Sequence, residues 1–428
     1  MRATLARTGS WQGFPVAFAF PRRLVLHPTG GAPVIPQAAV DPVLPPEVTA
    51  QARDLGPLES PLIWLTAAGA AVAILAVTIA LSRNRRARRW GISGAVALFL
   101  VAAVTAVNSY VGYVRTPEDL GRLFARGSGA ASAVGQLLTD GGGESDAITP
   151  ASQATAAHQQ PSSGQAIQVF SVADPARNVP SGDNYVILPP GYSDPANAHH
   201  RYPVVYLIHG YPYGGPRDWL TSGSAPDTLR SLEAAKVIEP MIVVSVDMTA
   251  GQPSKDWECL DVPGGPQLET YLAKTVVPAV DHRYRTVADR RHRALGGMSG
   301  GGFGALNIGL HHVDEFSNLV IALPYDDLND SIGVLNGNQA AIAANTPRRY
   351  LPTMAFSAPV SVMLAVGTGA PTDVATARRI AAAFHERGQE AVVHSEHGFN
   401  HTWHTARATL PYLLAFADQN FRGAGPAS

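Results

Sequence analysis

The stretch from residue 293 to residue 306 reads RALGGMSGGGFGAL and constrains the fold more than any other part of the chain. It contains the pattern G-x-S-x-G with Ser299 at its centre. The preceding residues 292–298 are typical of a buried strand, and residues 301–311 are typical of a helix. A serine on a sharp turn from strand to helix exposes its hydroxyl, and small neighbours are needed where the backbone is strained. Ser299 is therefore the candidate nucleophile.

The pattern alone also fits a glycine-rich turn with an incidental serine, because the chain contains 41 glycines. The predicted strand before it and the predicted helix after it favour the nucleophile, since this is the context that the motif requires.

Two long uncharged runs precede this region. Residues 61–81 and 90–114 contain 21 and 25 residues without Asp, Glu, Lys or Arg. Each run is long enough to cross a hydrocarbon core of about 30 Å as a helix. The alternative is a pair of buried core helices in a soluble protein. The short loop between the runs disfavours it, since this loop carries five arginines: Arg83, Arg85, Arg86, Arg88 and Arg89. We therefore expect two transmembrane helices.

The arginine-rich loop also predicts the orientation of the chain. Positively charged loops stay on the cytoplasmic side, so the N-terminal tail and everything after residue 114 should face outward. The expected location is the cell membrane, with two membrane passes and an extracytoplasmic catalytic domain.

Composition divides the chain into four parts. Residues 1–57 lack periodicity and are expected to be disordered or to be partly mis-assigned coding sequence. Residues 58–115 are expected to form the membrane anchor, and residues 116–166 a flexible linker rich in Gly, Ser and Ala. Residues 167–428 form the catalytic domain.

The net charge of −1 gives no reason to expect nucleic acid as a partner, and the single cysteine, Cys259, excludes an intrachain disulfide framework. The sequence does not indicate protein partners.

In the last part, short β-rich runs alternate with amphipathic helices. The predicted strands are 167–172, 184–188, 203–208, 240–246, 292–298, 319–323, 361–366 and 391–394. The predicted helices are 225–237, 267–280, 301–312, 373–387 and 402–420. This alternation predicts the α/β class, with a mostly parallel sheet and helices on both of its faces. Ligands bind such sheets at the C-terminal ends of the strands, and Ser299 lies there.

A serine nucleophile needs a base, and the base needs an acid that holds its tautomer. In folds of this type the chain order is Ser, acid, His. Asp373 follows the strand 361–366 and is the candidate acid, although an ordinary helix N-cap is the alternative. Other candidates for the acid are Asp326, Asp327 and Asp330, but these residues follow an earlier strand.

Four histidines lie near the C-terminus, at His394, His397, His401 and His404. A metal site would use such a cluster, but Gly398 and Asn400 disfavour a helix that presents two of them together, so we expect no metal. His401 follows the last strand and opens the last helix, which makes it the candidate base.

Backbone N–H groups are the expected donors to the oxyanion that develops during acyl transfer. One comes from Gly300, the residue after the nucleophile. The other comes from Tyr211, in the loop after the strand that ends at Ile208, although residues 211–215 also fit a plain flexible turn. No cofactor is expected.

Residues 168–421 resemble the esterase group of α/β-hydrolases that includes mycolyltransferases, S-formylglutathione hydrolases, feruloyl esterases and enterochelin-type esterases. The resemblance lies in VILPPGY (186–192), YPVVYLIHGYP (202–212), Asp256-Trp257, ETYL (269–272) and Val277-Pro278. It implies an α/β-hydrolase fold with Ser299 as nucleophile, Asp373 as acid and His401 as base. His401-Thr402-Trp403 is similar to the His-x-Trp of the group, and Trp403 is a candidate substrate contact.

These features predict a membrane-anchored serine esterase that acts on a small-molecule or lipid ester through an acyl-enzyme. An acyltransferase that moves the acyl chain to a sugar or lipid hydroxyl is the first alternative, because a triad does not reveal the acceptor. A non-catalytic binding module on a hydrolase fold is the second.

Overall fold

The structure is a computed structural model, and it describes residues 40–125, 165–211 and 213–425. The expectations for residues 1–39 and for residues 126–164 of the linker lie outside the described residues. The expectation of a flexible linker is wrong for its first residues, because Pro117–Ala125 form helix α4.

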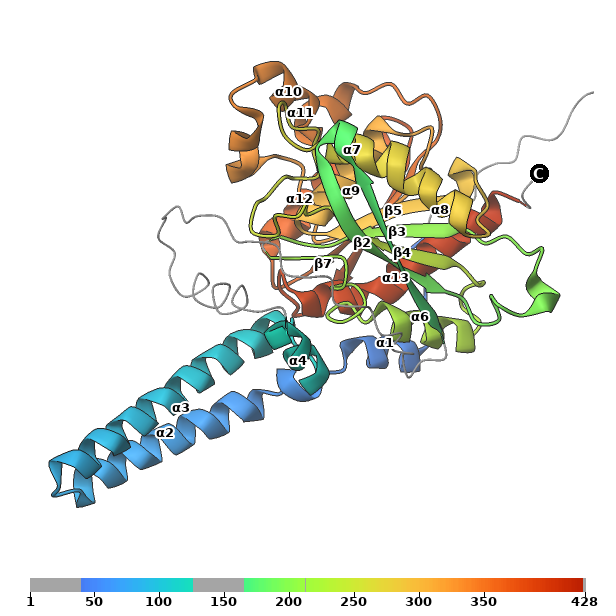
Figure 1. The fold of residues 1–428 in the computed structure, drawn as a ribbon. Coiled ribbons are helices and arrows are strands. Elements are labelled where there is room, and N and C mark those ends of the chain that lie inside the picture. The colour runs from blue at the N-terminus through green and yellow to red at the C-terminus, as the bar shows by residue number, and fades with distance from the viewer. Residues whose placement is uncertain (1–39, 126–164, 212, 426–428) are drawn as a thin grey trace, which may run out of the picture. The chain divides into compact units, whose positions relative to one another are not determined.

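The predicted sheet is present and has eight strands in the order β1-β2-β4-β3-β5-β6-β7-β8 (Figure 1). Strands β1 and β2 pair antiparallel, β2 pairs antiparallel with β4, and all other neighbours run parallel. The α/β-hydrolase class with a mostly parallel sheet is thereby confirmed. The strands span Ala166–Asp174 (β1), Val179–Leu188 (β2), Val204–Ile208 (β3), Ile242–Val246 (β4), Arg293–Met298 (β5), Asn318–Ala322 (β6), Ser361–Gly367 (β7) and Glu390–Glu396 (β8).

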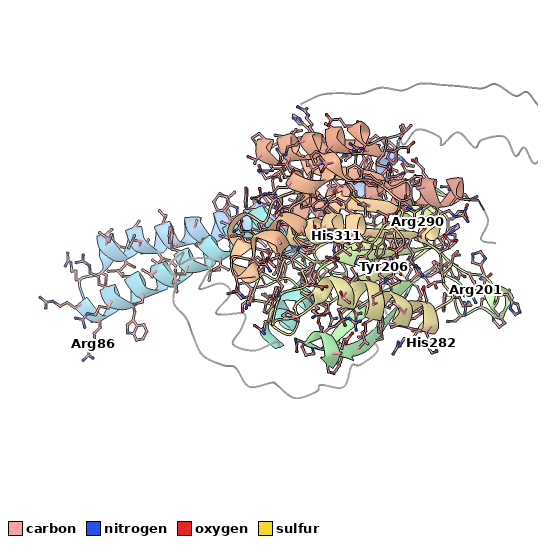
Figure 2. All side chains as sticks on the ribbon, turned by 90° about the horizontal axis from the view of Figure 1, so that it is seen from above. Arg86, Arg201, Tyr206, His282, Arg290 and His311 are labelled. Atoms are coloured by element: carbon pink, nitrogen blue, oxygen red, sulfur yellow. The ribbon has the colours of Figure 1, made fainter. Side chains whose placement is uncertain are left out.

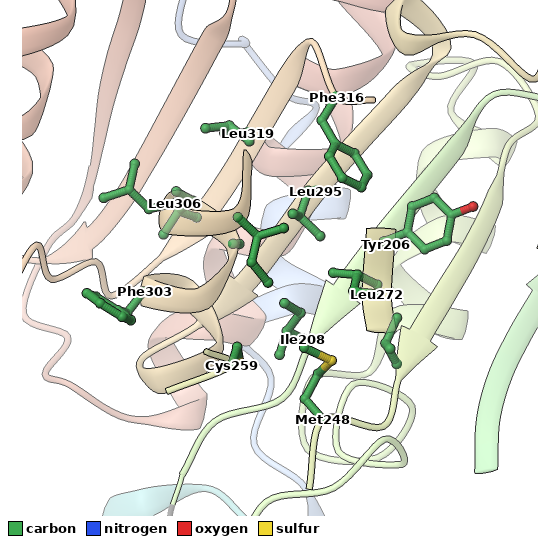
Figure 3. Close-up of a cluster of buried hydrophobic side chains, with 14 of the residues drawn as sticks. Tyr206, Ile208, Met248, Cys259, Leu272, Leu295, Phe303, Leu306, Phe316 and Leu319 are labelled. Carbon is green, nitrogen blue, oxygen red and sulfur yellow. The ribbon is translucent and has the colours of Figure 1, made fainter. Parts of the chain in front are cut away.

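Both faces of the sheet are covered, as the apolar character of the central strands predicts. In β3, Val204, Tyr206 and Ile208 point into one core cluster, whereas Val205 and Leu207 point into the other. Figure 3 shows the first cluster, in which side chains of β3 and β5 meet those of α9. Because successive side chains of a strand point to opposite faces, one apolar run supplies both cores.

Helices α8, α9 and α12 contribute to the first core, and α6 and α13 contribute to the second (Figure 1). The helices of the catalytic domain span Ala225–Ala234 (α6), Leu268–Tyr271 (α7), Val277–Arg283 (α8), Gly300–His311 (α9), Gln339–Ala344 (α10), Pro347–Tyr350 (α11), Pro371–Glu386 (α12) and Trp403–Gly423 (α13). Helices α10 and α11 lie in a segment for which the sequence predicted no element.

The helix predicted over 267–280 is present as an unbroken helical stretch from Leu268 to Arg283, but it is not a regular α-helix throughout. The structure has α7, then a π-helical turn over Leu272–Val276, then α8. Pro278 explains the difference, because its ring crowds the carbonyl four residues earlier and it has no N–H to donate. The backbone widens into a π turn at this point and then resumes its α-helical course.

Helices α2 (Pro61–Leu81) and α3 (Arg85–Val111) form an antiparallel pair, with Arg86 at its far end (Figure 2). The second helix begins before the predicted residue 90, at the Asn84 cap, and ends at Gly112, whose φ is 73°. Both helices are long and apolar enough to cross a membrane. The buried residues between them are small, namely Ala71, Thr78, Ala95 and Ala102. Most large apolar side chains of the pair are exposed. Small residues let two membrane helices approach closely.

The expectation of disorder is wrong for residues 40–57. Helix α1 (Pro46–Arg53) buries Val48 and Ala52 and packs on α13 and α6. Arg53 forms an ion pair with Glu396 of β8 at 2.9 Å, and Asp41 accepts a hydrogen bond from His394 at 3.0 Å. Burial lowers the pKa of His394, but the hydrogen bonds that His394 donates to the Asp41 and Glu396 carboxylates outweigh it and raise this pKa to about 9. This segment is ordered by contacts with residues that lie far away in the sequence. Its own composition does not reveal these contacts.

Glu59 lies just before α2 and is fully buried, with 0% of its side chain exposed. Its carboxylate accepts a hydrogen bond from Arg407 of α13 at 3.0 Å, and that guanidinium is 1% exposed. Arg115, after α3, is a second cation at 3.6 Å. A buried charge that loses its partner is strongly destabilising. This ion pair therefore fastens the start of α2 to the last helix of the catalytic domain.

We expect Glu59→Leu to lower the free energy of unfolding by about 3–5 kcal/mol, because it leaves the Arg407 cation buried without its carboxylate. Thermal denaturation of the full chain in detergent micelles measures the loss. Glu59→Leu/Arg407→Leu should recover part of it, and the exposed Glu386→Leu should change little. An unchanged melting temperature for Glu59→Leu would contradict the importance of this pair.

Candidate active site

Ser299 occupies the turn between β5 and α9, with φ 53° and ψ −120°. L-residues rarely adopt such a backbone, and non-glycine residues that do so concentrate at functional sites. Two hydrogen bonds fix the turn: the Ser299 amide donates to the Ala322 carbonyl at 3.1 Å, and the Ser299 carbonyl accepts from Phe303 at 2.9 Å. The sharp turn lifts the Ser299 hydroxyl above the C-terminal edge of the sheet.

The two glycines of the motif are required by close backbone contacts. A Cβ on Gly297 would lie 2.3 Å from the Gly301 carbonyl oxygen. A Cβ on Gly301 would lie 2.3 Å from the His209 oxygen and 2.4 Å from the Ile208 oxygen. No side chain fits at such distances, so α9 reaches this position above β3 only with glycine.

The structure brings the predicted base and acid to this serine. His401 Nε2 lies 2.9 Å from Ser299 Oγ, and His401 Nδ1 lies 2.6 Å from Asp373 Oδ2. A carboxylate only accepts hydrogen bonds, so Nδ1 carries the proton and Nε2 is free to accept from the serine hydroxyl. With 40% of its side chain exposed, His401 is open to a substrate, whereas Asp373 at 15% is largely covered.

Asp373 comes from the first turn of α12, just after β7, and points to His401. Its competitor Asp326 is instead held by two arginines, Arg348 at 3.0 Å and Arg379 at 2.8 Å. Asp327 also lies near Arg348, at 3.3 Å. The side chain of Asp330 lies outside the described residues.

The other C-terminal histidines have separate partners. His394 binds Asp41 and Glu396, as described above, and His397 is exposed. His404 donates from Nε2 to the Ser109 carbonyl at 3.0 Å and accepts from Arg407 at Nδ1. Burial lowers the pKa of His404. The histidines thus occupy different surroundings, and within the described ranges no cluster of three metal-ligating side chains occurs.

The two predicted oxyanion donors lie side by side. Strands β3 and β5 are parallel neighbours, with Ile208 beside Gly297, so the residues that follow them meet at one edge. A Cβ on Gly300 would lie 3.7 Å from the Tyr211 backbone nitrogen. Gly300 is also the first residue of α9, where helix geometry leaves the N–H without an intrahelical acceptor.

Comparison with known proteins now identifies the family. The model of the Esterase family matches residues 183–416, which is more than half of the chain and includes Tyr211, Ser299, Gly300, Asp373 and His401. The chain belongs to the Esterase family.

Two curated relatives match this Esterase-family chain over shorter stretches. An uncharacterized protein of Corynebacterium glutamicum is 33% identical over 138 residues, which are 32% of this chain and 31% of the relative. An endo-1,4-beta-xylanase/feruloyl esterase of Xylanibacter ruminicola is 31% identical over 137 residues, which are 31% of this chain and 18% of the relative. The matches therefore span about a third or less of each relative.

Two solved structures share the fold. A ferulic acid esterase is 24% identical, with a TM-score of 0.52, and covers 60% of this chain and 98% of its own. An S-formylglutathione hydrolase from Agrobacterium tumefaciens is 16% identical, with a TM-score of 0.51, and covers 61% and 98%.

The Esterase-family chain has further polar residues beside the candidate oxyanion donors, and the sequence analysis gave these residues no catalytic role. A pocket next to Gly300 and Tyr211 is also lined by Asp256 and Glu258. Glu258 is 4% exposed and accepts a hydrogen bond from the Tyr325 hydroxyl at 2.7 Å. Burial, reinforced by the nearby Asp256 carboxylate, raises the pKa of Glu258 to about 8. Only the segment DWEC hints at this pair of carboxyls, and Tyr325 is far away in sequence.

Trp403 does not lie where a substrate contact is expected. It is 5% exposed and packs edge-on against Trp219, with ring centroids 5.3 Å apart, in the core beneath α13. A large aromatic side chain at the start of a helix gains more from burial than from exposure. The expectation that Trp403 binds substrate is therefore corrected to a packing role.

We expect Gly301→Ala to cost about 1–3 kcal/mol of unfolding free energy or more, because the new methyl group collides with two backbone carbonyls. Ester turnover should fall with it, since the turn that carries Ser299 must move. Gly333→Ala is the matched control, because a Cβ there meets nothing within 4 Å. Equal melting temperatures for the two variants would contradict the tight contact.

Glu258 also predicts a pH dependence of stability. Between its ordinary pKa of 4.5 and about 8, the folded chain keeps the Glu258 proton and the unfolded chain releases it. Stability should therefore decrease as the pH rises through this window, by up to about 1.4 kcal/mol per pH unit for one proton.

Glu258→Gln removes this titration while keeping the shape of the side chain. Denaturation midpoints at pH 5, 6, 7 and 8 should fall less steeply for the variant than for the unsubstituted chain. Identical slopes would show that Glu258 is ionised in the folded state.

Proposed function

We propose that this chain is a serine carboxylic-ester hydrolase that works through an acyl-enzyme on the outer side of a membrane. The observation that carries the proposal is the continuous row of hydrogen bonds from Asp373 through His401 to Ser299, on a strained turn. Membership of the Esterase family supports ester chemistry.

In the first half of the reaction, Ser299 Oγ attacks the carbonyl carbon of the ester while His401 Nε2 takes its proton. The Asp373 carboxylate stabilises the imidazolium that forms. The backbone N–H groups of Gly300 and Tyr211 donate to the developing oxyanion, at roughly 3 kcal/mol each. The imidazolium then returns the proton to the leaving alcohol, and the acyl group remains on Ser299.

In the second half, a water molecule replaces the alcohol. His401 takes a proton from this water, which attacks the acyl carbonyl, and the acid is released as Ser299 regains its proton. A sugar or lipid hydroxyl in place of water would make the same residues an acyltransferase, because only the acceptor differs.

The helix pair supports the proposed location. Helix α2 has 21 residues and is about 31 Å long, which matches the hydrocarbon core of a bilayer. The arginines at 83–89 lie where α2 connects to α3, at the end of the pair opposite Glu59 and Val111. Because such charges stay in the cytoplasm, the catalytic domain would face outward.

Ser299→Ala should abolish the activity, with a fall in kcat of about a thousandfold or more, because no other group replaces the attacking oxygen. The test uses the full chain in detergent micelles, a p-nitrophenyl ester of a short acid, and mass spectrometry of the products. The exposed Ser193→Ala is the matched control and should retain full turnover.

Free acid as the only acyl product would agree with a hydrolase. Acyl-sugar that forms at the expense of free acid when a sugar is added would identify a transferase. Turnover that is equal in Ser299→Ala and in the unsubstituted chain would reject the serine mechanism and leave a binding module.

A further inference from the structure

The outer end of the helix pair contacts the segment that carries the candidate base. Ser109, in the last turn of α3, accepts the hydrogen bond from His404. Gly112 ends the helix, and a Cβ there would lie 2.8 Å from the His404 ring. His404 follows His401 by three residues, so their Cα atoms are at most about 11 Å apart. The end of α3 is therefore close to the catalytic histidine.

The same end of the pair contacts the segment that carries the second oxyanion donor. The Tyr113 hydroxyl donates to Asp218 at 3.0 Å, and the Tyr113 carbonyl accepts from Ser222 at 2.7 Å. The other carboxylate oxygen of Asp218 accepts from the Gly215 amide at 2.9 Å. Gly215, Asp218 and Ser222 lie in the connection from β3 to α6, which also contains Tyr211.

The buried Glu59–Arg407 ion pair makes this junction tight. Arg407 donates to Glu59 and also to the Ser222 carbonyl at 2.8 Å, so one guanidinium of α13 joins the residues just before α2 to the loop after β3. Val111 and Tyr113 pack against the core beneath α13. The helix pair is thus attached at both of its outer ends, and a flexible tether alone would not produce these contacts.

Both contacted segments leave the sheet at the C-terminal ends of parallel strands, which is the edge where Ser299 lies. Arg201 and His282 belong to the opposite edge of the sheet, because Arg201 comes just before β3 and His282 lies at the end of α8, before β5. When the pair spans a bilayer, the edge with the active site faces that bilayer.

We propose that this junction holds the active site at the outer bilayer surface, and that the substrate is an amphiphilic ester that resides in the outer leaflet. The proposal rests on the proposed function. A water-soluble ester can reach the active site whichever way the catalytic domain is turned relative to the membrane. Holding the domain in one orientation would therefore not speed the hydrolysis of such an ester. A lipid ester stays in the interfacial layer, and a site held at that layer meets it at high effective concentration.

The first test measures position without any activity. A fluorophore is attached to the full chain, in a Cys259→Ala background, through His397→Cys beside the active site or through His282→Cys at the opposite edge. Both positions are exposed. In phosphatidylcholine nanodiscs with nitroxide-labelled headgroups, we expect strong quenching at 397 and little at 282. Equal quenching, or stronger quenching at 282, would overturn the proposal.

The second test measures the substrate class. The full chain in phosphatidylcholine vesicles is given a long-chain fluorogenic ester that stays in the bilayer, or a water-soluble acetate ester. Loosening the junction with Tyr113→Ala should lower the ratio of the first rate to the second by at least about tenfold. A defect in folding lowers both rates together, so an unchanged ratio would overturn the proposal.

The two tests distinguish failure of the proposed esterase function from failure of the proposed lipid substrate. If the unsubstituted chain hydrolyses neither ester, the proposed function is wrong, and the quenching comparison still decides whether this edge of the domain lies at the bilayer. If it hydrolyses the soluble ester but not the bilayer ester, the function holds and the lipid substrate is rejected.

Discussion

The active-site edge depends on one close contact, in which the backbone of α9 at Gly301 lies against the carbonyl groups of Ile208 and His209. No side chain fits between these atoms, so the helix sits directly on the end of β3. This contact holds Ser299 in its strained conformation, and the same contact places Gly300 beside the Tyr211 amide. The candidate nucleophile and both candidate oxyanion donors are therefore positioned together, and moving one of them moves the others.

The rest of the site is assembled by the parallel sheet. Ser299, Asp373 and His401 follow β5, β7 and β8, and the regular spacing of strands brings their loops to one edge. The hydrogen bonds at 2.6 and 2.9 Å then require only that each loop present one side chain toward its neighbour. A rigid sheet supplies this precision at positions where loops alone would be mobile.

The helix pair is built into the domain at the same edge. The Glu59–Arg407 ion pair is almost completely buried, and such a pair costs desolvation that only good geometry and further hydrogen bonds offset. Arg407 obtains these bonds from Ser222 and His404. A polar network of this kind specifies one arrangement of its parts. Here those parts are the start of α2, the end of α3 and two loops of the candidate site.

The sequence alone determined the elements whose signals are local: the turn at Ser299, the strand and helix periods, and two apolar runs of membrane length. It also limited the acid and the base to a few residues after the right strands. Only the tertiary structure decided which residues meet. It pairs His401 with Asp373, places Trp403 in the core, puts Tyr325 on Glu258, and joins Glu59 to Arg407 across 348 residues. The physical reason is that backbone sterics and periodicity act between near neighbours, whereas burial and pairing depend on segments that only folding brings together.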